Sequence, residues 1–180
     1  RMPAVETTGL TKRYGDVVAL SDLSLSVADG ELFGLLGPNG SGKTTTIEML
    51  TGQREPTEGT VSVLGHDPVT DPLDVRRAIG ILPEREDPPS FLTPREYLEF
   101  VGQVRGLEDI DDRIGQWADR LSITHKLDTL SSDLSEGERQ RVMLAQAFVH
   151  EPDLVFIDEP LVNLDPILQE EVKDHLRDYC

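Results

Sequence analysis

The chain has 180 residues, a length suited to one domain that buries a substantial core. Its 17 Lys and Arg against 34 Asp and Glu give a net charge of −17, which argues against nucleic-acid binding because a phosphate backbone would repel such a surface. A hydrophobic content of 37% excludes a disordered chain, and the apolar runs are too short to span a bilayer. No secretory leader is expected, and the single cysteine, Cys180, excludes an internal disulfide.

The acidic residues are spread along the chain and are not collected in a tail. The simplest interpretation is a solvated acidic surface. A sharper hypothesis is a protein of a high-salt cytoplasm, where dense carboxylates keep a protein soluble.

The first third of the chain is predicted to be mainly β structure. Leu23, Leu25 and Val27 alternate with serines, which is typical of a half-buried antiparallel strand. The other elements expected here, in chain order, are strands at residues 5–10, 17–20, 32–36 and 60–64, with a turn at 14–16, and a helix at residues 44–51 that Gly52 would end.

Residues 85–150 are predicted to be mainly helical. Thr93 and Glu96 form a capping box with Pro94 at the first helical position, which indicates a helix start. Four apolar residues recur at helical spacing and predict a buried helix face: Ile110, Ile114, Trp117 and Leu121.

Two short apolar strands are expected beside these helices, at Ile79–Leu82 and Leu154–Ile157, and a last helix at residues 166–176. A fully apolar strand is typical of a parallel sheet covered on both faces. Because strands alternate with helices, the sequence predicts an α/β fold with a mostly parallel sheet and an antiparallel N-terminal part.

Residues 37–44 match the phosphate-loop pattern G-x-x-x-x-G-K-[ST] in full, between an expected strand and an expected helix. An ordinary glycine-rich turn is the alternative, and this context disfavours it. We expect backbone N–H groups and the helix start to surround phosphate oxygens, Lys43 to reach the β and γ phosphates, and Thr44 to hold Mg²⁺. The expected ATP-binding residues of this segment are Gly37, Pro38, Asn39, Gly40, Ser41, Gly42, Lys43, Thr44 and Thr45.

The strand Leu154–Ile157 ends in two acids, Asp158 and Glu159. Parallel strands place such residues at the carboxyl edge of the sheet, where ligands bind. Asp158 is expected to bind the metal and Glu159 to orient or deprotonate the attacking water. Solvated acids at a strand end are the alternative interpretation.

Residues 134–138 read Leu134, Ser135, Glu136, Gly137 and Glu138. Ser135 and Glu138 form a capping box that predicts a helix as far as Phe148. The same helix start is a candidate anion site. A single chain has no obvious need for a second phosphate site beside the phosphate loop. A dimer needs one if the helix start of each copy completes the phosphate site of its partner.

Taken together, these motifs resemble the ATP-binding subunit of ABC transporters, of the exporter-like kind, over essentially the whole chain. The resemblance implies a P-loop NTPase core, ATP and Mg²⁺. It implies that Tyr14 stacks on adenine, although packing on a hairpin is the other interpretation. It also implies signature residues at 134–138 that contact ATP across a dimer, Glu84 and Asp158 at the metal, Glu159 as the catalytic base and Asp165 in dimer communication.

The chain departs from the family pattern at several positions. Glu84 stands where the family usually has Gln, Glu136 and Glu138 replace a Gly and the Gln of the signature, and Leu161 and Val162 replace small or hydroxylated residues. We expect Glu136 and Glu138 to point away from a bound phosphate. No histidine fits the family's switch role, so surface roles are expected for His66, His125, His150 and His175, and the domain is expected to be incomplete at its C-terminus.

The expected organisation is one ABC ATPase domain over residues 1–180, with a nucleotide-binding core at 1–84 and 151–180 and a helical signature subdomain at 85–150. The expected function is ATP-driven transport, at the cytoplasmic face of a membrane, with a transmembrane permease and a second ATP-binding subunit as partners. No nucleic-acid partner is expected. The alternative is an ABC-type ATPase that acts on nucleic acid or ribosomes.

Overall fold

The computed structural model describes residues 2–31, 33, 40–83 and 86–158. It divides into two compact units, one running to Ile79 and one starting at Gly80, and each is described here by itself. The expected strand at 32–36 and helix at 166–176 lie outside the described residues, wholly or in most of their length. The subdomain boundaries expected from the sequence stay a prediction.

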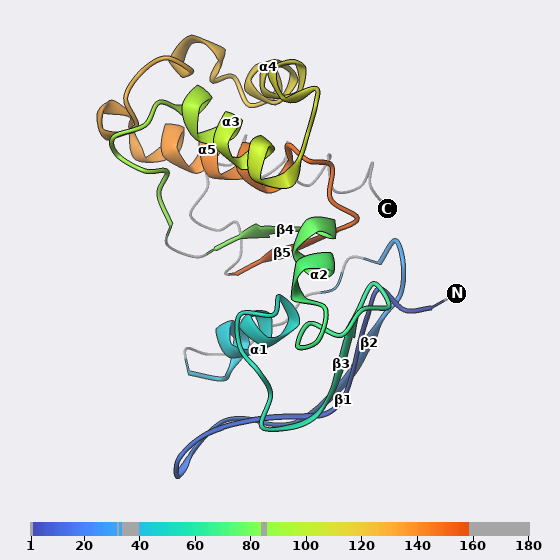
Figure 1. The fold of residues 1–180 in the computed structure, drawn as a ribbon. Helices are drawn as coiled ribbons and strands as arrows, with labels where there is room; N and C mark the ends of the chain where they lie inside the picture. Colours follow the sequence, from blue (N-terminus) through green and yellow to red (C-terminus); the bar gives the residue numbers. More distant parts are fainter. Residues whose placement is uncertain (1, 32, 34–39, 84–85, 159–180) are drawn as a thin grey trace. The chain divides into compact units, whose positions relative to one another are not determined.

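The first unit contains an antiparallel sheet of order β2-β1-β3 (Figure 1), formed by β1 (Val5–Tyr14), β2 (Val17–Val27) and β3 (Glu58–Val63). Two-residue alternation explains the sheet, because Val5 and Thr7 are buried while Glu6 is exposed. β1 and β2 form one hairpin whose last pair is Tyr14 with Val17. Its turn contains Gly15 with a φ of 58°, a left-handed conformation that glycine adopts without strain.

Two helices complete the described part of this unit. α1 (Lys43–Leu50) ends before Gly52, which has a φ of 69°, as the sequence predicts. α2 (Pro72–Ala78) was not expected. It has only seven residues, too few for a periodic apolar pattern, and its first residue, Pro72, also suits a turn.

The second unit contains β4 (Ile79–Leu82) and β5 (Leu154–Ile157), which pair as a two-stranded parallel sheet (Figure 1). Between them along the chain come three α-helices and two short 3₁₀ turns. Their bounds are α3 (Pro94–Arg105), α4 (Ile110–Arg120), η1 (Thr124–Lys126), η2 (Ser131–Asp133) and α5 (Glu136–Phe148).

The core of the second unit forms among its three helices. The apolar face predicted for α4 is confirmed, since Ile114 is fully buried and the Trp117 ring stacks on Phe148 of α5 at 5.3 Å. Gly102 lets α3 approach α4, because a Cβ there would lie 2.4 Å from Ile110. Gly80 does the same for β4, where a Cβ would lie 2.2 Å from the Ala147 carbonyl oxygen.

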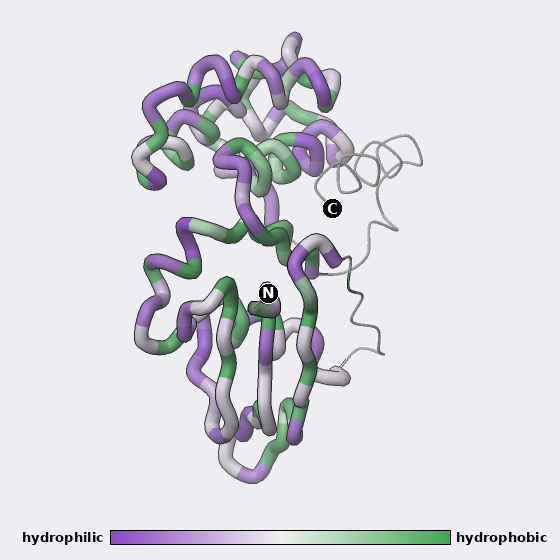
Figure 2. Tube along the Cα trace, turned by 90° about the vertical axis from the view of Figure 1, so that its right-hand side faces the viewer, coloured by the Kyte–Doolittle hydropathy of each residue, from purple (hydrophilic) through white to green (hydrophobic). Residues whose placement is uncertain are grey.

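Hydrophilic and hydrophobic residues are interleaved along the strands of the first unit and the helices of the second (Figure 2). This pattern is the one expected of elements with one buried and one solvated face. In the part of the chain that the structure describes, no helix has both the length and the apolar character to cross a membrane. The predicted α/β class, with an antiparallel N-terminal sheet and a parallel sheet, is confirmed.

Candidate functional site

The described part of the phosphate loop is strongly turned and leads directly into α1. Gly40 and Gly42 have φ values of 83° and 88°. A Cβ on Gly42 would lie 2.5 Å from the carbonyl oxygen of Ala19, so only glycine fits there. Gly42 is also the N-cap of α1, and it has no side chain with which to cap the first amides. N–H groups at the start of a helix are in general suited to bind an anion, so this position stays the candidate phosphate site.

The side chains at this helix start differ in exposure. Lys43 and Thr45 are half-buried and Thr44 is exposed. Thr46, which the motif does not include, is buried, and its hydroxyl donates to the Gly42 carbonyl oxygen at 2.8 Å. Thr46 therefore fixes the joint between loop and helix. Gly37, Pro38 and Asn39 lie outside the described residues.

Tyr14 lies at the end of β1 with its side chain 43% exposed. Two cations flank the ring: Lys12 Nζ lies 5.3 Å and the Arg54 guanidinium carbon 5.5 Å from its centroid. Lys12 also donates to the Glu55 carbonyl oxygen at 2.6 Å, and Arg54 pairs with Glu48, whose hydrogen bond raises the pKa of Arg54. The sequence analysis missed both cations, although Lys12 is two residues from Tyr14 on the same strand and so shares its face.

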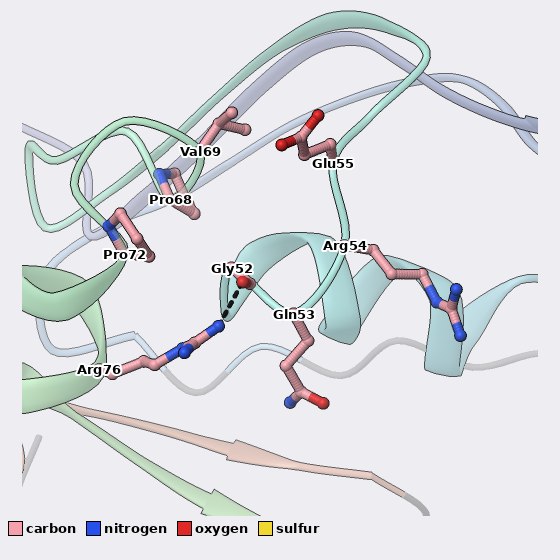
Figure 3. A pocket seen from close by; sticks show the side chains of 8 residues that line it. All are labelled: Gly52, Gln53, Arg54, Glu55, Pro68, Val69, Pro72 and Arg76. Atoms are coloured by element: carbon pink, nitrogen blue, oxygen red, sulfur yellow. Dashed lines mark hydrogen bonds between the residues drawn. The ribbon is translucent and has the colours of Figure 1, made fainter.

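A small cavity of about 210 Å³ lies at the other end of α1. Arg76 of α2 reaches over this helix end and donates to the Gly52 carbonyl oxygen (Figure 3). It also donates to the Thr51 carbonyl oxygen at 3.3 Å. Eight residues of α1 span about 12 Å, so this cavity is separate from the phosphate loop. Its lining residues are Gly52, Gln53, Arg54, Glu55, Pro68, Val69, Pro72 and Arg76.

The signature segment in the second unit starts α5 with a complete capping box. The Ser135 hydroxyl accepts from the Glu138 amide at 3.3 Å, and the Glu138 carboxylate accepts from the Ser135 amide at 2.8 Å. Lys126 Nζ lies 3.3 Å from the other carboxylate oxygen. The hydrogen bond from the Ser135 amide, helped by Lys126, lowers the pKa of Glu138. Leu134 is buried, whereas Ser135, Glu136 and Gly137 are exposed.

The signature segment is tied to the stretch that follows β4. Arg139 donates to the Leu134 carbonyl oxygen at 2.6 Å and to the Asp87 carboxylate at 3.1 Å. Backbone bonds from Ser131 to Leu92 and from Ser132 to Ser90 add to this connection. Residues 87–92 and 131–139 therefore form one hydrogen-bonded framework.

Asp158 is half-buried directly after β5, and its amide donates to the Leu82 carbonyl oxygen at 2.9 Å. β4 and β5 are neighbours, so the residues that follow them lie at one edge of the sheet. Asp158 carries a carboxylate and Thr44 a hydroxyl, and both groups are oxygen donors of the kind that Mg²⁺ prefers. Glu84, Glu159 and Asp165 lie outside the described residues, and their predicted roles stay predictions.

Comparisons with known proteins agree with these motifs. The family model described as ABC transporter matches residues 20–162. The chain is 36% identical over 176 residues to the Nod factor export ATP-binding protein I of Sinorhizobium fredii, covering 97% of this chain and 51% of that protein. It is 38% identical over 176 residues to the daunorubicin/doxorubicin resistance ATP-binding protein DrrA of Streptomyces peucetius, covering 97% and 53%. The chain thus spans about half the length of these curated relatives.

Two solved structures are similar in fold. One is an ATP-binding subunit of an ABC transporter, with a TM-score of 0.90, 30% identity, and coverage of 98% of this chain and 74% of that one. The other is cbiO1 from Clostridium perfringens, part of the transporter complex cbiONQ, with a TM-score of 0.80, 26% identity, and coverage of 99% and 74%.

Proposed function

Because the chain belongs to the ABC transporter family, we propose that it is the ATP-binding and ATP-hydrolysing part of a subunit that powers transport across a membrane. The observation that supports this most directly is the helix start at Gly42 and Lys43, where a turned glycine loop leads into α1 without a side-chain cap. Two relatives are named for export and for drug resistance, which favours an exporter. The transported substrate is left open.

ATP would bind at the phosphate loop of the first unit. The backbone amides of residues 40–45 would donate to phosphate oxygens, and Lys43 would supply the cation at the β and γ phosphates. Thr46 would keep the loop in place through the Gly42 carbonyl. Tyr14 would stack on the base, with Lys12 and Arg54 holding the ring.

Thr44, Glu84 and Asp158 would hold Mg²⁺ at the nucleotide. When bound, Mg²⁺ neutralises charge that develops on the phosphate oxygens. Glu159 would orient the attacking water and accept its proton. The backbone bond from Asp158 to Leu82 supports this proposal, because it fixes the strand end that would present the carboxylate.

The exposed residues of the signature segment would complete the ATP site of a second copy. Ser135 and the N-terminal amides of α5 would donate to the γ-phosphate held by the partner's loop. Gly137 is exposed, and nothing lies within 4 Å of the place where a Cβ would be, so the segment presents open backbone. Asp165 would relay the state of one site to the other.

A transmembrane permease would dock on the stretch after β4, at residues 84–98. Phe91 is 76% exposed there, and Arg139 and Asp87 link this stretch to the signature segment. The subunit would thus work at the cytoplasmic face of the membrane, in a high-salt cytoplasm if its acidity serves solubility. The alternative, a nucleic-acid or ribosome ATPase, is not favoured by the charge of −17 or by the short helices α3 and α4.

The proposal is tested with the full-length protein that contains this chain. Lys43→Ala removes a charge-assisted contact worth about 1.5–3 kcal/mol, so ATP affinity should fall at least tenfold and hydrolysis should be lost. Calorimetric titration with ATP and a phosphate-release assay measure the two effects. Arg77→Ala, which removes an exposed surface cation of the first unit, is the control. Near-native ATP affinity in the Lys43 variant would contradict the phosphate-loop assignment.

A further inference from the structure

The signature segment carries two acids at a helix start that is proposed to receive a phosphate, and only one of them is neutralised. Glu138 pairs with Lys126, whereas Glu136 is exposed and makes no ion pair with the described residues. We propose that Lys126 is a positioning residue that holds the Glu138 carboxylate against the start of α5, away from the phosphate that Ser135 would contact in a second copy. This inference rests on the proposed ATP-dependent dimer.

Two contacts fix the Glu138 carboxylate, and a third fixes its backbone. One carboxylate oxygen accepts from the Ser135 amide at 2.8 Å, and the other lies 3.3 Å from Lys126 Nζ. The Glu138 amide donates back to the Ser135 hydroxyl at 3.3 Å. The side chains of Lys126 and Glu138 are 30% and 23% exposed, so water screens the pair only in part. Glu138 is thereby bent back over the helix start.

The position of Lys126 is itself built into the fold. It ends η1, where its amide donates to Ile123 at 2.9 Å and its carbonyl oxygen accepts from Thr129 at 3.0 Å. The residues that flank η1, Ile123 and Leu127, are buried and anchor the turn in the core of the second unit. The Lys126 ammonium group is therefore held by a side chain whose backbone is fixed.

The neighbouring arginines of α5 are engaged elsewhere. Arg139 donates to the Leu134 carbonyl oxygen and pairs with Asp87, and Arg141 donates to the Leu121 carbonyl oxygen at 2.9 Å. Within the described residues, Lys126 is the ion-pair partner of Glu138. Loss of Lys126 would leave an uncompensated carboxylate beside a phosphate, and like charges a few ångströms apart repel strongly.

The test uses the full-length protein with Glu159→Gln, which is expected to retain ATP. Dimer formation is followed by light scattering as Mg-ATP is added, with and without Lys126→Met. We expect Lys126→Met to raise the Mg-ATP concentration at half-dimerisation by up to about fivefold, since such a pair is worth up to roughly fivefold and each of the two sites in the dimer takes up one ATP. Lys126→Arg should restore the parent value.

A second variant separates charge from folding. Glu138→Gln keeps the capping geometry without the charge, so in that background Lys126→Met should leave half-dimerisation unchanged. Arg113→Met is the control, because it breaks ion pairs with Asp109 and Glu151 in the same unit and should lower the melting temperature without changing the ATP requirement.

Two results would overturn the inference while leaving the proposed function in place: an unchanged ATP requirement in Lys126→Met, or an effect that persists with Glu138→Gln. If the parent Glu159→Gln protein stays monomeric at saturating Mg-ATP, the proposed dimer is wrong and the inference is overturned with it. In the Glu159-intact protein, the same logic predicts a higher KM for ATP with little change in kcat.

Discussion

Tyr14 lies on a simple hairpin, and we propose that it also contacts the base of ATP. Its place at the last pair of β1 and β2 is enough to explain an aromatic residue there. Its 43% exposure and the two cations beside the ring are not required by a hairpin, and they hold the ring in a defined orientation. Both interpretations from the sequence therefore have a physical basis, and a ligand experiment separates them.

Tyr14→Ala should weaken the binding of adenine and guanine nucleotides to similar extents, by about 1–3 kcal/mol, because stacking uses the face of a base and not its hydrogen-bonding edge. Calorimetric titration with ATP and with GTP measures both. Tyr14→Phe keeps the ring and should bind like the parent. Unchanged affinity for both nucleotides in the alanine variant would assign Tyr14 to hairpin packing alone.

The phosphate loop and the signature segment could be recognised from the spacing of their residues. The residues that support these two motifs could not be. The capping box of Ser135 and Glu138 follows from a local pattern, and the structure contains it. Lys126 is twelve positions from Glu138, in a 3₁₀ turn that no periodicity indicates, and only the fold brings the two together. Thr46 was missed for a different reason, since its hydroxyl acts through the Gly42 backbone and not on a ligand.

At the scale of elements, the start of α5 combines a stabilising cap with a proposed binding role. The Ser135 amide lowers the pKa of Glu138, so the folded state favours the ionised carboxylate. A carboxyl whose pKa is lower in the folded state adds stability above its unfolded pKa. That stability is lost as the pH falls through the folded value.

Glu138→Gln should therefore remove this contribution at pH 7 and flatten the fall in stability below about pH 4.5, the ordinary pKa of this carboxyl. Urea denaturation between pH 3 and pH 7, followed by circular dichroism, provides the measurement. The control is Glu136→Gln. Glu136 is an exposed acid of the same helix turn and makes no ion pair with the described residues. Parallel curves for parent and Glu138→Gln would show that the cap does not depend on the charge.

Elements with long or strongly patterned sequences were predicted best. The apolar spacing of α4 and the capping box of α3 each predicted a helix where the structure has one. The strands β1 and β2 are longer than expected and form one continuous hairpin. β1 was underestimated because it continues past Leu10, and β2 was expected as two pieces because Asp22, at positive φ, looks like a break in the sequence but lies within the paired strand. α2 was missed because it is a short, proline-initiated helix.

Each described unit contains a helix start suited to a phosphate. In the first unit it is the glycine-capped α1, and in the second it is the serine-capped α5. A single ATP needs the first kind of site, and the second is accounted for if it serves the ATP of another copy. This reasoning makes the dimer the central prediction for the full-length protein.

Glu159→Gln tests that prediction in the full-length protein. The change keeps the size and hydrogen bonding of the side chain but removes its basicity, so hydrolysis should fall by about 10²–10⁴-fold. ATP binding should survive, because Lys43, Thr44 and the loop backbone hold the phosphates. With hydrolysis blocked, ATP would stay between Lys43 of one copy and Ser135 of the other, and light scattering with Mg-ATP should detect a dimer. Ser135→Arg should disperse it by steric blockage. A monomer at saturating ATP, with undiminished hydrolysis, would show that Glu159 is not the base and that the two copies do not share their sites.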